Sequence, residues 1–137
     1  MKKLIKRYVL AGFAASLLVV NSVYANEVDI LSADLRNSSG DWWTTNVTIE
    51  HKDTGWEHYV DQWRVVDETG NVLGNRVLHH PHVDEQPFTR GTADINIPKG
   101  TVTIYIEAHD TVHGWSPNRL KIDMTQTING YVRVNAD

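Results

Sequence analysis

The sequence predicts an all-β domain, an immunoglobulin-like or fibronectin-like antiparallel sandwich of about seven strands. After residue 25, apolar residues rarely recur at helical spacing, and alternating or β-branched runs dominate. Gly, Pro, Asn and Asp separate these runs at short intervals. This number of short strands in a chain of this length is typical of such sandwiches.

The first four predicted strands lie between residues 28 and 78. Residues 28–35 form the first, and the alternation of apolar and polar residues in NVTIEH indicates a second over 44–52. HYVDQWRVV indicates a third strand over 58–66. The turn DETGN, of Gly-Asn type, leads into the fourth, 72–78.

A histidine-rich loop follows, and then the strand patterns resume. An IPKG turn joins the predicted strands 92–97 and 101–108, and in the latter Val102, Ile104 and Ile106 share one face. This hairpin resembles the E-to-F corner of fibronectin-like domains, a resemblance that implies fold and not function. The last expected strand segments are 120–128 and, after the turn NGY, 131–134.

The first 25 residues predict a cleaved secretory signal peptide. Four basic residues precede Tyr8, an apolar run follows, and small residues stand at the positions read before a cleavage after Ala25. A spanning helix needs about 20 apolar residues, and this run is shorter, so we expect no membrane insertion after cleavage. Residues 26–137 are then a single β-sandwich domain in a periplasmic or secreted protein.

Charge and residue usage narrow the expected partners. Without the four basic residues of the signal peptide, nine basic residues face 17 acidic ones, a net charge of −8. This charge argues against nucleic acid and anionic membrane surfaces as partners. The chain has no cysteine, and Met124 is the one methionine after the signal peptide. Imidazoles and carboxylates are therefore the ligands left for a metal, and they suit zinc, copper(II), nickel or non-haem iron.

All seven histidines fall in three predicted loops. His51 and His58 bracket HKDTGWEH, a second group lies in LHHPHVDEQPFTR, and His109 and His113 lie in AHDTVHGW. If consecutive strands run antiparallel, these three loops share one end of the sandwich. The turns DETGN and IPKG, which hold no histidine, lie at the other end.

This clustering predicts a site for a divalent metal ion, copper(II) or zinc. Pro81 stiffens the frame that carries two of the imidazoles, and Asp110 lies between two others as a ligand or as a partner that fixes a tautomer. The predicted ligands are His80, His82, His109 and His113, with His51, His58, Glu85 and Asp110 as weaker candidates. In the same region QPFTR is expected to hold its loop in place, with Phe88 in the core and Arg90 paired with an acid.

Other functions remain open at this point. Each histidine motif alone is more often an ordered loop, so the alternative is a metal-free protein–protein interaction domain that uses the same loops to bind a periplasmic partner. No catalytic motif is recognised, which leaves an oxidative enzyme with bound copper or iron as a weaker hypothesis. A carbohydrate-binding module that uses Trp42 or Trp43 is weaker still, because adjacent strand residues face opposite sides and one of the pair is expected in the core.

The phrase HPHVDEQPFTR, with GWEHYVDQW before it and AHDTVHGW after it, resembles a group of short exported bacterial proteins. The resemblance extends from about Asp41 to Met124. It implies export, and it implies no activity and no particular ligand.

Overall fold

The computed structural model describes residues 28–137, and the predicted signal peptide lies outside them. Eight strands and one short 3₁₀ helix follow one another along the chain. They are β1 (Asp29–Ser39), β2 (Trp42–Glu50), β3 (Val60–Asp67), β4 (Val72–Val77), β5 (Phe88–Asn96), β6 (Thr103–Asp110), β7 (Gly114–Asp123), η1 (Met124–Gln126) and β8 (Tyr131–Asn135).

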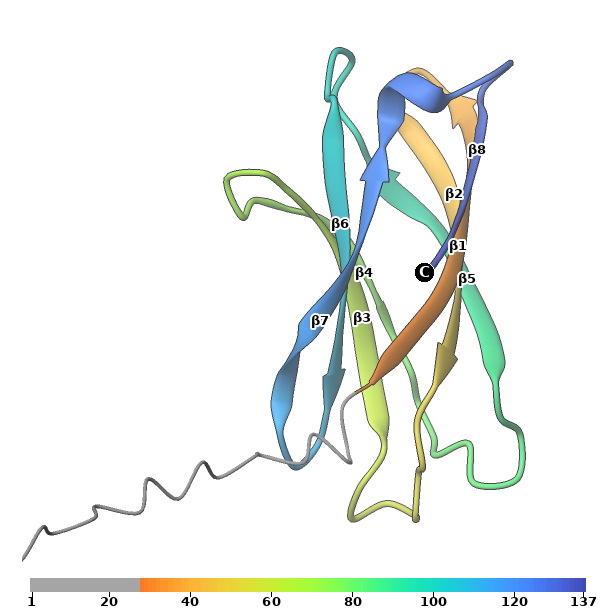
Figure 1. Ribbon diagram of the computed structural model, residues 1–137, viewed down its shortest axis with the longest axis vertical. Coiled ribbons are helices and arrows are strands. Elements are labelled where there is room, and N and C mark those ends of the chain that lie inside the picture. Colours follow the sequence, from red (N-terminus) through yellow and green to blue (C-terminus); the bar gives the residue numbers. More distant parts are fainter. Residues whose placement is uncertain (1–27) are drawn as a thin grey trace, which may run out of the picture.

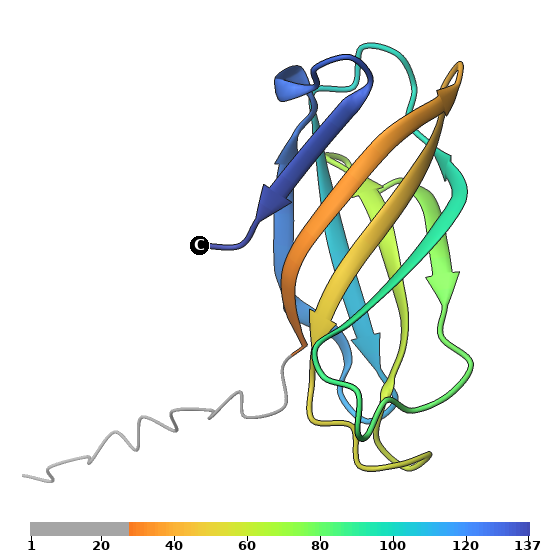
Figure 2. The same ribbon diagram turned by 90° about the vertical axis from the view of Figure 1, so that its right-hand side faces the viewer.

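The strands form two antiparallel four-stranded sheets, which confirms the predicted β-sandwich class. One sheet has the order β5-β2-β1-β8 and the other β4-β3-β6-β7. Figures 1 and 2 show the two sheets packed face to face, with loops at two opposite ends. Among the described residues no helix is long and apolar enough to cross a membrane.

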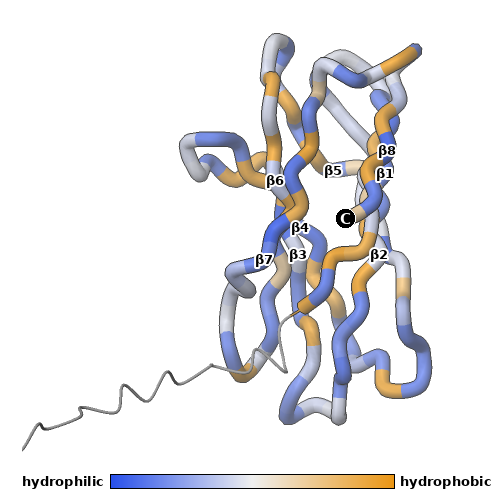
Figure 3. Tube along the Cα trace, viewed as in Figure 1, coloured by the Kyte–Doolittle hydropathy of each residue, from blue (hydrophilic) through white to orange (hydrophobic). Residues whose placement is uncertain are grey.

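The core lies between the sheets and follows the alternation of the strands. In β2 the buried residues are Thr45, Val47 and Ile49, and in β6 they include Ile104 and Ile106. Trp63 of β3 is fully buried among them. Figure 3 shows the resulting mixture of hydrophobic and hydrophilic segments along each strand. Burial of these side chains stabilises the fold because it removes apolar surface from water.

Two strands begin four or more residues earlier than the sequence predicts, and β2 begins at Trp42, two residues early. β5 starts at Phe88 instead of residue 92, because Phe88 pairs with Ile49 and packs into the core. β7 starts at Gly114 and not at residue 120. Gly114 has φ +79°, a conformation that favours glycine, and it closes a tight turn so that pairing with β6 resumes at once.

The three histidine loops lie at the same end of the sandwich. Figure 1 shows the loops β2–β3, β4–β5 and β6–β7 together at the bottom of the molecule, with β1–β2 and β5–β6 at the top. Hydrogen bonds join the bottom loops to one another. The Tyr59 N–H donates to Thr111 Oγ1 at 3.2 Å, and the His82 N–H donates to Asp53 Oδ2 at 2.8 Å. The shared end expected from the strand count is therefore present.

Candidate metal centre

Three side chains extend the inward faces of their strands beyond the apolar core. His51 follows Ile49 by two residues, and Asp110 follows Ala108 by two, so both keep the inward orientation of the strand. His58 precedes the buried Val60 by two residues. Together the three close the bottom of the core. Within residues 28–137, one ligand atom from each lies within 4.8 Å of the other two, an arrangement that could hold a metal ion.

Two hydrogen bonds hold His51 in place. Its side chain is 1 % exposed, and its Nδ1 lies 2.6 Å from Asp53 Oδ1. Its backbone N–H donates to Gln86 Oε1 at 3.0 Å. Its other ring nitrogen, Nε2, is buried without a hydrogen-bond partner and faces Asp110 Oδ2 at 3.8 Å. The ring therefore presents one free nitrogen to the centre.

Asp53 fixes which nitrogen of His51 is free. Burial raises the pKa of this carboxyl, but hydrogen bonds from His51 and from the backbone N–H groups of His82 and Val60 outweigh burial and lower the pKa overall. The carboxylate is thus ionised at neutral pH and can only accept hydrogen bonds. His51 must donate through Nδ1–H, which leaves the lone pair on Nε2.

The second imidazole faces the same carboxylate. His58 Nε2 lies 3.5 Å from Asp110 Oδ1 and, like His51 Nε2, is buried without a hydrogen-bond partner. The two imidazole rings meet edge to face, with centroids 4.9 Å apart. Buried polar atoms are normally paired, so two unpaired nitrogens around one carboxylate form a donor set that could hold an ion.

Asp110 is itself anchored by the β6–β7 turn. Its Oδ1 accepts hydrogen bonds from the backbone N–H groups of Val112, at 2.8 Å, and of His113, at 2.6 Å. Burial raises the pKa of Asp110, but these backbone bonds and the His113 side chain bring it below its usual value. Oδ2 faces His51 Nε2, while the His113 Nδ1 lies 3.1 Å from Oδ2 and 3.2 Å from Oδ1.

The spacings at the centre suit a bridging ion better than direct hydrogen bonds. The two contacts from imidazole Nε2 to Asp110, 3.5 and 3.8 Å, exceed the usual N–H···O range of about 2.7–3.2 Å. Two ligands bound tetrahedrally to zinc at about 2.0–2.1 Å are about 3.3 Å apart. The three ligand atoms, which lie within 4.8 Å of one another, would therefore move closer together to bind one ion.

His113 lies at the outer edge of this group. Its ring centroid is 5.0 Å from that of His58, and its side chain is 47 % exposed. It is the most exposed side chain around the centre, and it already contacts the Asp110 carboxylate. His113 could therefore reach an ion held by the other three.

The other predicted ligands lie outside this group. His109 is one residue before Asp110, so it faces the outer side of its sheet, where it contacts Asp61 through Nδ1 and meets the Trp115 ring at 5.0 Å. His80 is exposed, and its ring lies 4.6 Å from that of His82. Glu85 pairs with Arg90.

His82 is buried, but in a different environment. Its ring stacks on Phe88 with centroids 3.9 Å apart, and its backbone N–H binds Asp53. Both ring nitrogens are buried without a hydrogen-bond partner. Burial, together with the positive charge of Arg90 and the nearby His80, lowers the pKa of His82, so its imidazole is neutral at pH 7.

The QPFTR segment holds its loop against the centre, as predicted. Gln86 receives the His51 N–H and donates to the His82 carbonyl at 2.9 Å. Phe88 is 2 % exposed, and Arg90 pairs with Glu85. The loop thus supports His51 directly through Gln86. It also supports His51 indirectly, because the His82 N–H binds Asp53, which in turn binds the His51 ring.

The sequence offers His51 only as a weaker candidate ligand, and it does not single out Asp53. His51 could have been found from the alternation of buried residues Thr45, Val47, Ile49 and His51. In this alternation His51 occupies the next inward-facing position after the end of β2. Asp53 carries no such signal, because its role depends on contacts with three separate segments.

Comparison with known proteins finds a similar protein. A "Putative lipoprotein" of Halomicrobium mukohataei (strain ATCC 700874 / DSM 12286 / JCM 9738 / NCIMB 13541) is 33 % identical over 97 residues, which cover 71 % of this chain and 47 % of that protein. The chain thus spans about half the length of this relative. No family model and no solved structure matches the chain.

Proposed function

We propose that the protein is an exported binding module that holds one divalent transition metal ion between its β2–β3 and β6–β7 loops, with the β4–β5 loop in a supporting role. His51, His58 and Asp110 supply the first three ligands, through the two Nε2 atoms and the carboxylate. The observation that carries the proposal is the pair of buried, unpaired imidazole nitrogens around one ionised carboxylate.

The ligand types favour zinc or copper(II). Two imidazoles and a carboxylate are a sufficient set for either metal. His113 would complete a four-ligand shell if it exchanged its contact with Asp110 for the ion. Asp53 would act through His51, as carboxylates commonly do behind metal-binding histidines.

Export is part of the proposal. The N-terminal signal pattern supports it, and the word lipoprotein in the name of the similar Halomicrobium mukohataei protein is consistent with a location outside the cytoplasm. A periplasmic or secreted module of this kind could store or deliver the ion, or use it to stabilise the fold.

The test is metal content and thermal stability of the purified protein. An ion at 100 times its dissociation constant should stabilise the fold by about 2.7 kcal/mol. We expect one equivalent of zinc or copper(II) per chain and a clear rise in melting temperature. Unchanged melting in zinc, copper(II) and nickel, together with no effect of a chelator, would exclude the proposal.

A metal-free interaction domain is the second candidate, and exposed apolar residues favour it. Each bottom loop presents one such residue: Trp56 at 67 % exposure, Val83 at 51 % and Val112 at 58 %. Apolar side chains at loop tips are common contacts with protein partners. Substituting these three residues with Ser should leave metal binding intact. If the variant keeps its metal affinity but no longer binds a protein partner, the two functions are separate.

A further inference from the structure

A second hollow lies at the end of the sandwich opposite the histidine loops. It has a volume of about 530 Å³ and is formed by the β1–β2 turn, the β5–β6 turn and the 3₁₀ helix. We call it the Trp43 pocket. Its size falls in the range of about 300–1,000 Å³ that small-molecule sites occupy.

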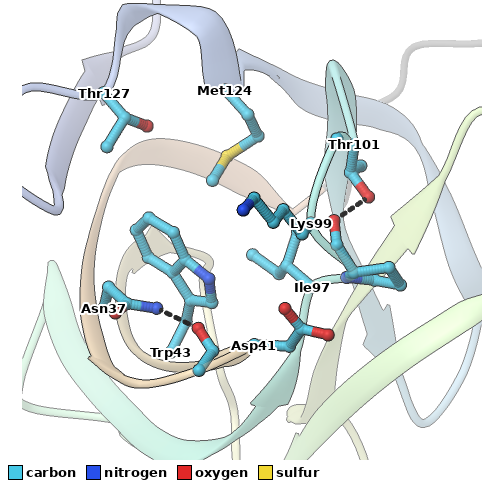
Figure 4. A pocket seen from close by; sticks show the side chains of 11 residues that line it. Asn37, Asp41, Trp43, Ile97, Lys99, Thr101, Met124 and Thr127 are labelled. Carbon is cyan, nitrogen blue, oxygen red and sulfur yellow. Dashed lines mark hydrogen bonds between the residues drawn. The ribbon is translucent and has the colours of Figure 1, made fainter.

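One part of the wall of the Trp43 pocket is apolar. Trp43 is partly buried and packs against the core, and Ile97 and Met124 are buried beside it. Figure 4 shows the indole on one side of the hollow and the Met124 thioether above it. Trp42, the neighbouring residue, is 49 % exposed and is not part of the lining. The pair thus divides as the sequence predicts, one residue against the core and one exposed.

The mouth of the pocket carries one charge of each sign. Figure 4 shows the Lys99 ammonium and the Asp41 carboxylate on the border of the same hollow as the indole. Neither takes part in an ion pair with another residue of the described chain. The turn that carries Asp41 is fixed, because the Asp41 carbonyl accepts the Ile97 N–H at 2.8 Å.

These charges select the class of ligand. Lys99 and Asp41 are exposed, and an apolar ligand that covered them would remove water from both charges without compensating either, which is unfavourable. A zwitterion compensates both, with its carboxylate on Lys99 and its ammonium on Asp41, as charge-assisted hydrogen bonds. An apolar substituent would then lie against Trp43 and Met124.

We propose that the Trp43 pocket binds a free α-amino acid with an apolar side chain. Lys99 recognises the carboxylate, Asp41 recognises the ammonium group, and Trp43 with Met124 receives the side chain. This site is separate from the metal centre and does not depend on it.

The probe is L-leucine, followed by NMR through the indole N–H resonance of Trp43. The matched analogues are isoamylamine, which lacks the carboxylate, and 4-methylpentanoate, which lacks the ammonium group. L-Leucine should shift the Trp43 resonance in a saturable way, and each analogue should bind at least about tenfold more weakly, the ratio expected for the loss of one charge-assisted hydrogen bond.

Two variants of exposed residues test the assignment of each charge. Lys99→Gln should abolish the preference for L-leucine over isoamylamine, and Asp41→Asn should abolish the preference over 4-methylpentanoate. The controls are Lys121→Gln and Asp94→Asn, which change exposed charges outside the pocket and should leave both preferences intact. If a substitution merely disturbed the structure of the pocket, both preferences would weaken together. The loss of one preference alone in each variant therefore identifies the charge that recognises each group.

Two results would overturn the proposal. One is the absence of any shift of the Trp43 resonance with L-leucine, L-methionine or L-phenylalanine up to about 10 mM, ten times the dissociation constant of a weak site near 1 mM. The other is a response to a neutral sugar, maltose or cellobiose, that both charge variants retain, because the pocket would then recognise carbohydrate.

Discussion

His51 Nδ1 lies 2.6 Å from Asp53 Oδ1, and both side chains are buried. The same carboxylate receives the backbone N–H groups of Val60 at 3.1 Å and His82 at 2.8 Å. Asp53 therefore joins the β2–β3 loop, the start of β3 and the β4–β5 loop. It also directs the free nitrogen of His51 towards His58 and Asp110.

Asp53→Asn should weaken metal binding while leaving the three proposed ligands in place. An amide holds the imidazole less firmly in the required tautomer, and loss of such a partner typically lowers metal affinity by about 10- to 100-fold. Competition with a chromophoric chelator measures the affinity. The control is Asp84→Asn, an exposed acid of the same end, which should bind metal as the wild type does. Equal affinity of Asp53→Asn and wild type would show that Asp53 has no role in the site.

His58→Ala and His109→Ala should differ in their effects on metal binding. His58 Nε2 faces Asp110, so its removal deletes a proposed ligand, and we expect stoichiometric binding to disappear at micromolar protein. His109 faces outward against Asp61 and Trp115, so its removal should leave affinity unchanged. Titration calorimetry of both variants decides the matter. The opposite ranking would favour the ligand set expected from the sequence.

The free energy of unfolding should depend on pH through the ionisation of the buried carboxylates Asp53 and Asp110. The pKa values of Asp53 and Asp110 in the folded protein lie below their ordinary value of 3.8. Each group therefore contributes stability above that ordinary value, and the contribution is lost as pH falls through the lower folded pKa.

For the metal-free protein, the difference in free energy of unfolding between wild type and Asp53→Asn should thus be largest near neutral pH and should shrink below about pH 3.8. Urea denaturation in chelator at several pH values measures this difference. If this difference in free energy of unfolding increased as the pH was lowered, Asp53 would not be ionised in the folded state, and the prediction would be wrong.

His82→Phe should stabilise the fold and retain metal binding. His82 stacks on Phe88, and its two ring nitrogens are buried without partners. Replacing an unpaired buried polar group with an apolar one of similar shape should raise the free energy of unfolding by about 1 kcal/mol. Urea denaturation tests this, with the exposed His79→Phe as the control. Loss of both stability and metal affinity would instead give the His82 imidazole a functional role.

The fold class and the shared end of the histidine loops could be predicted from the sequence, because strand alternation and turn residues are local signals. The ligand group was harder to predict. His109 and Asp110 are adjacent, so the choice between them depends on which one continues the inward face of β6. The burial of Ile104, Ile106 and Ala108 makes that residue Asp110.

The contribution of Asp53 depends on long-range contacts and has no local signal. Its partners His51, Val60 and His82 come from three different segments, and the sequence pattern around it is that of an ordinary polar loop. The same holds for Gln86, whose bond to His51 connects residues 35 positions apart.

The central claim is that one ion is bound by His51, His58 and Asp110. The most direct measurement is a crystal structure of the zinc-loaded protein, with anomalous scattering recorded at the zinc edge. We predict a single strong peak about 2.0–2.2 Å from His51 Nε2, His58 Nε2 and an Asp110 carboxylate oxygen. A peak located instead at His80 and His82 or at His109, or no peak at saturating zinc, would contradict the claim.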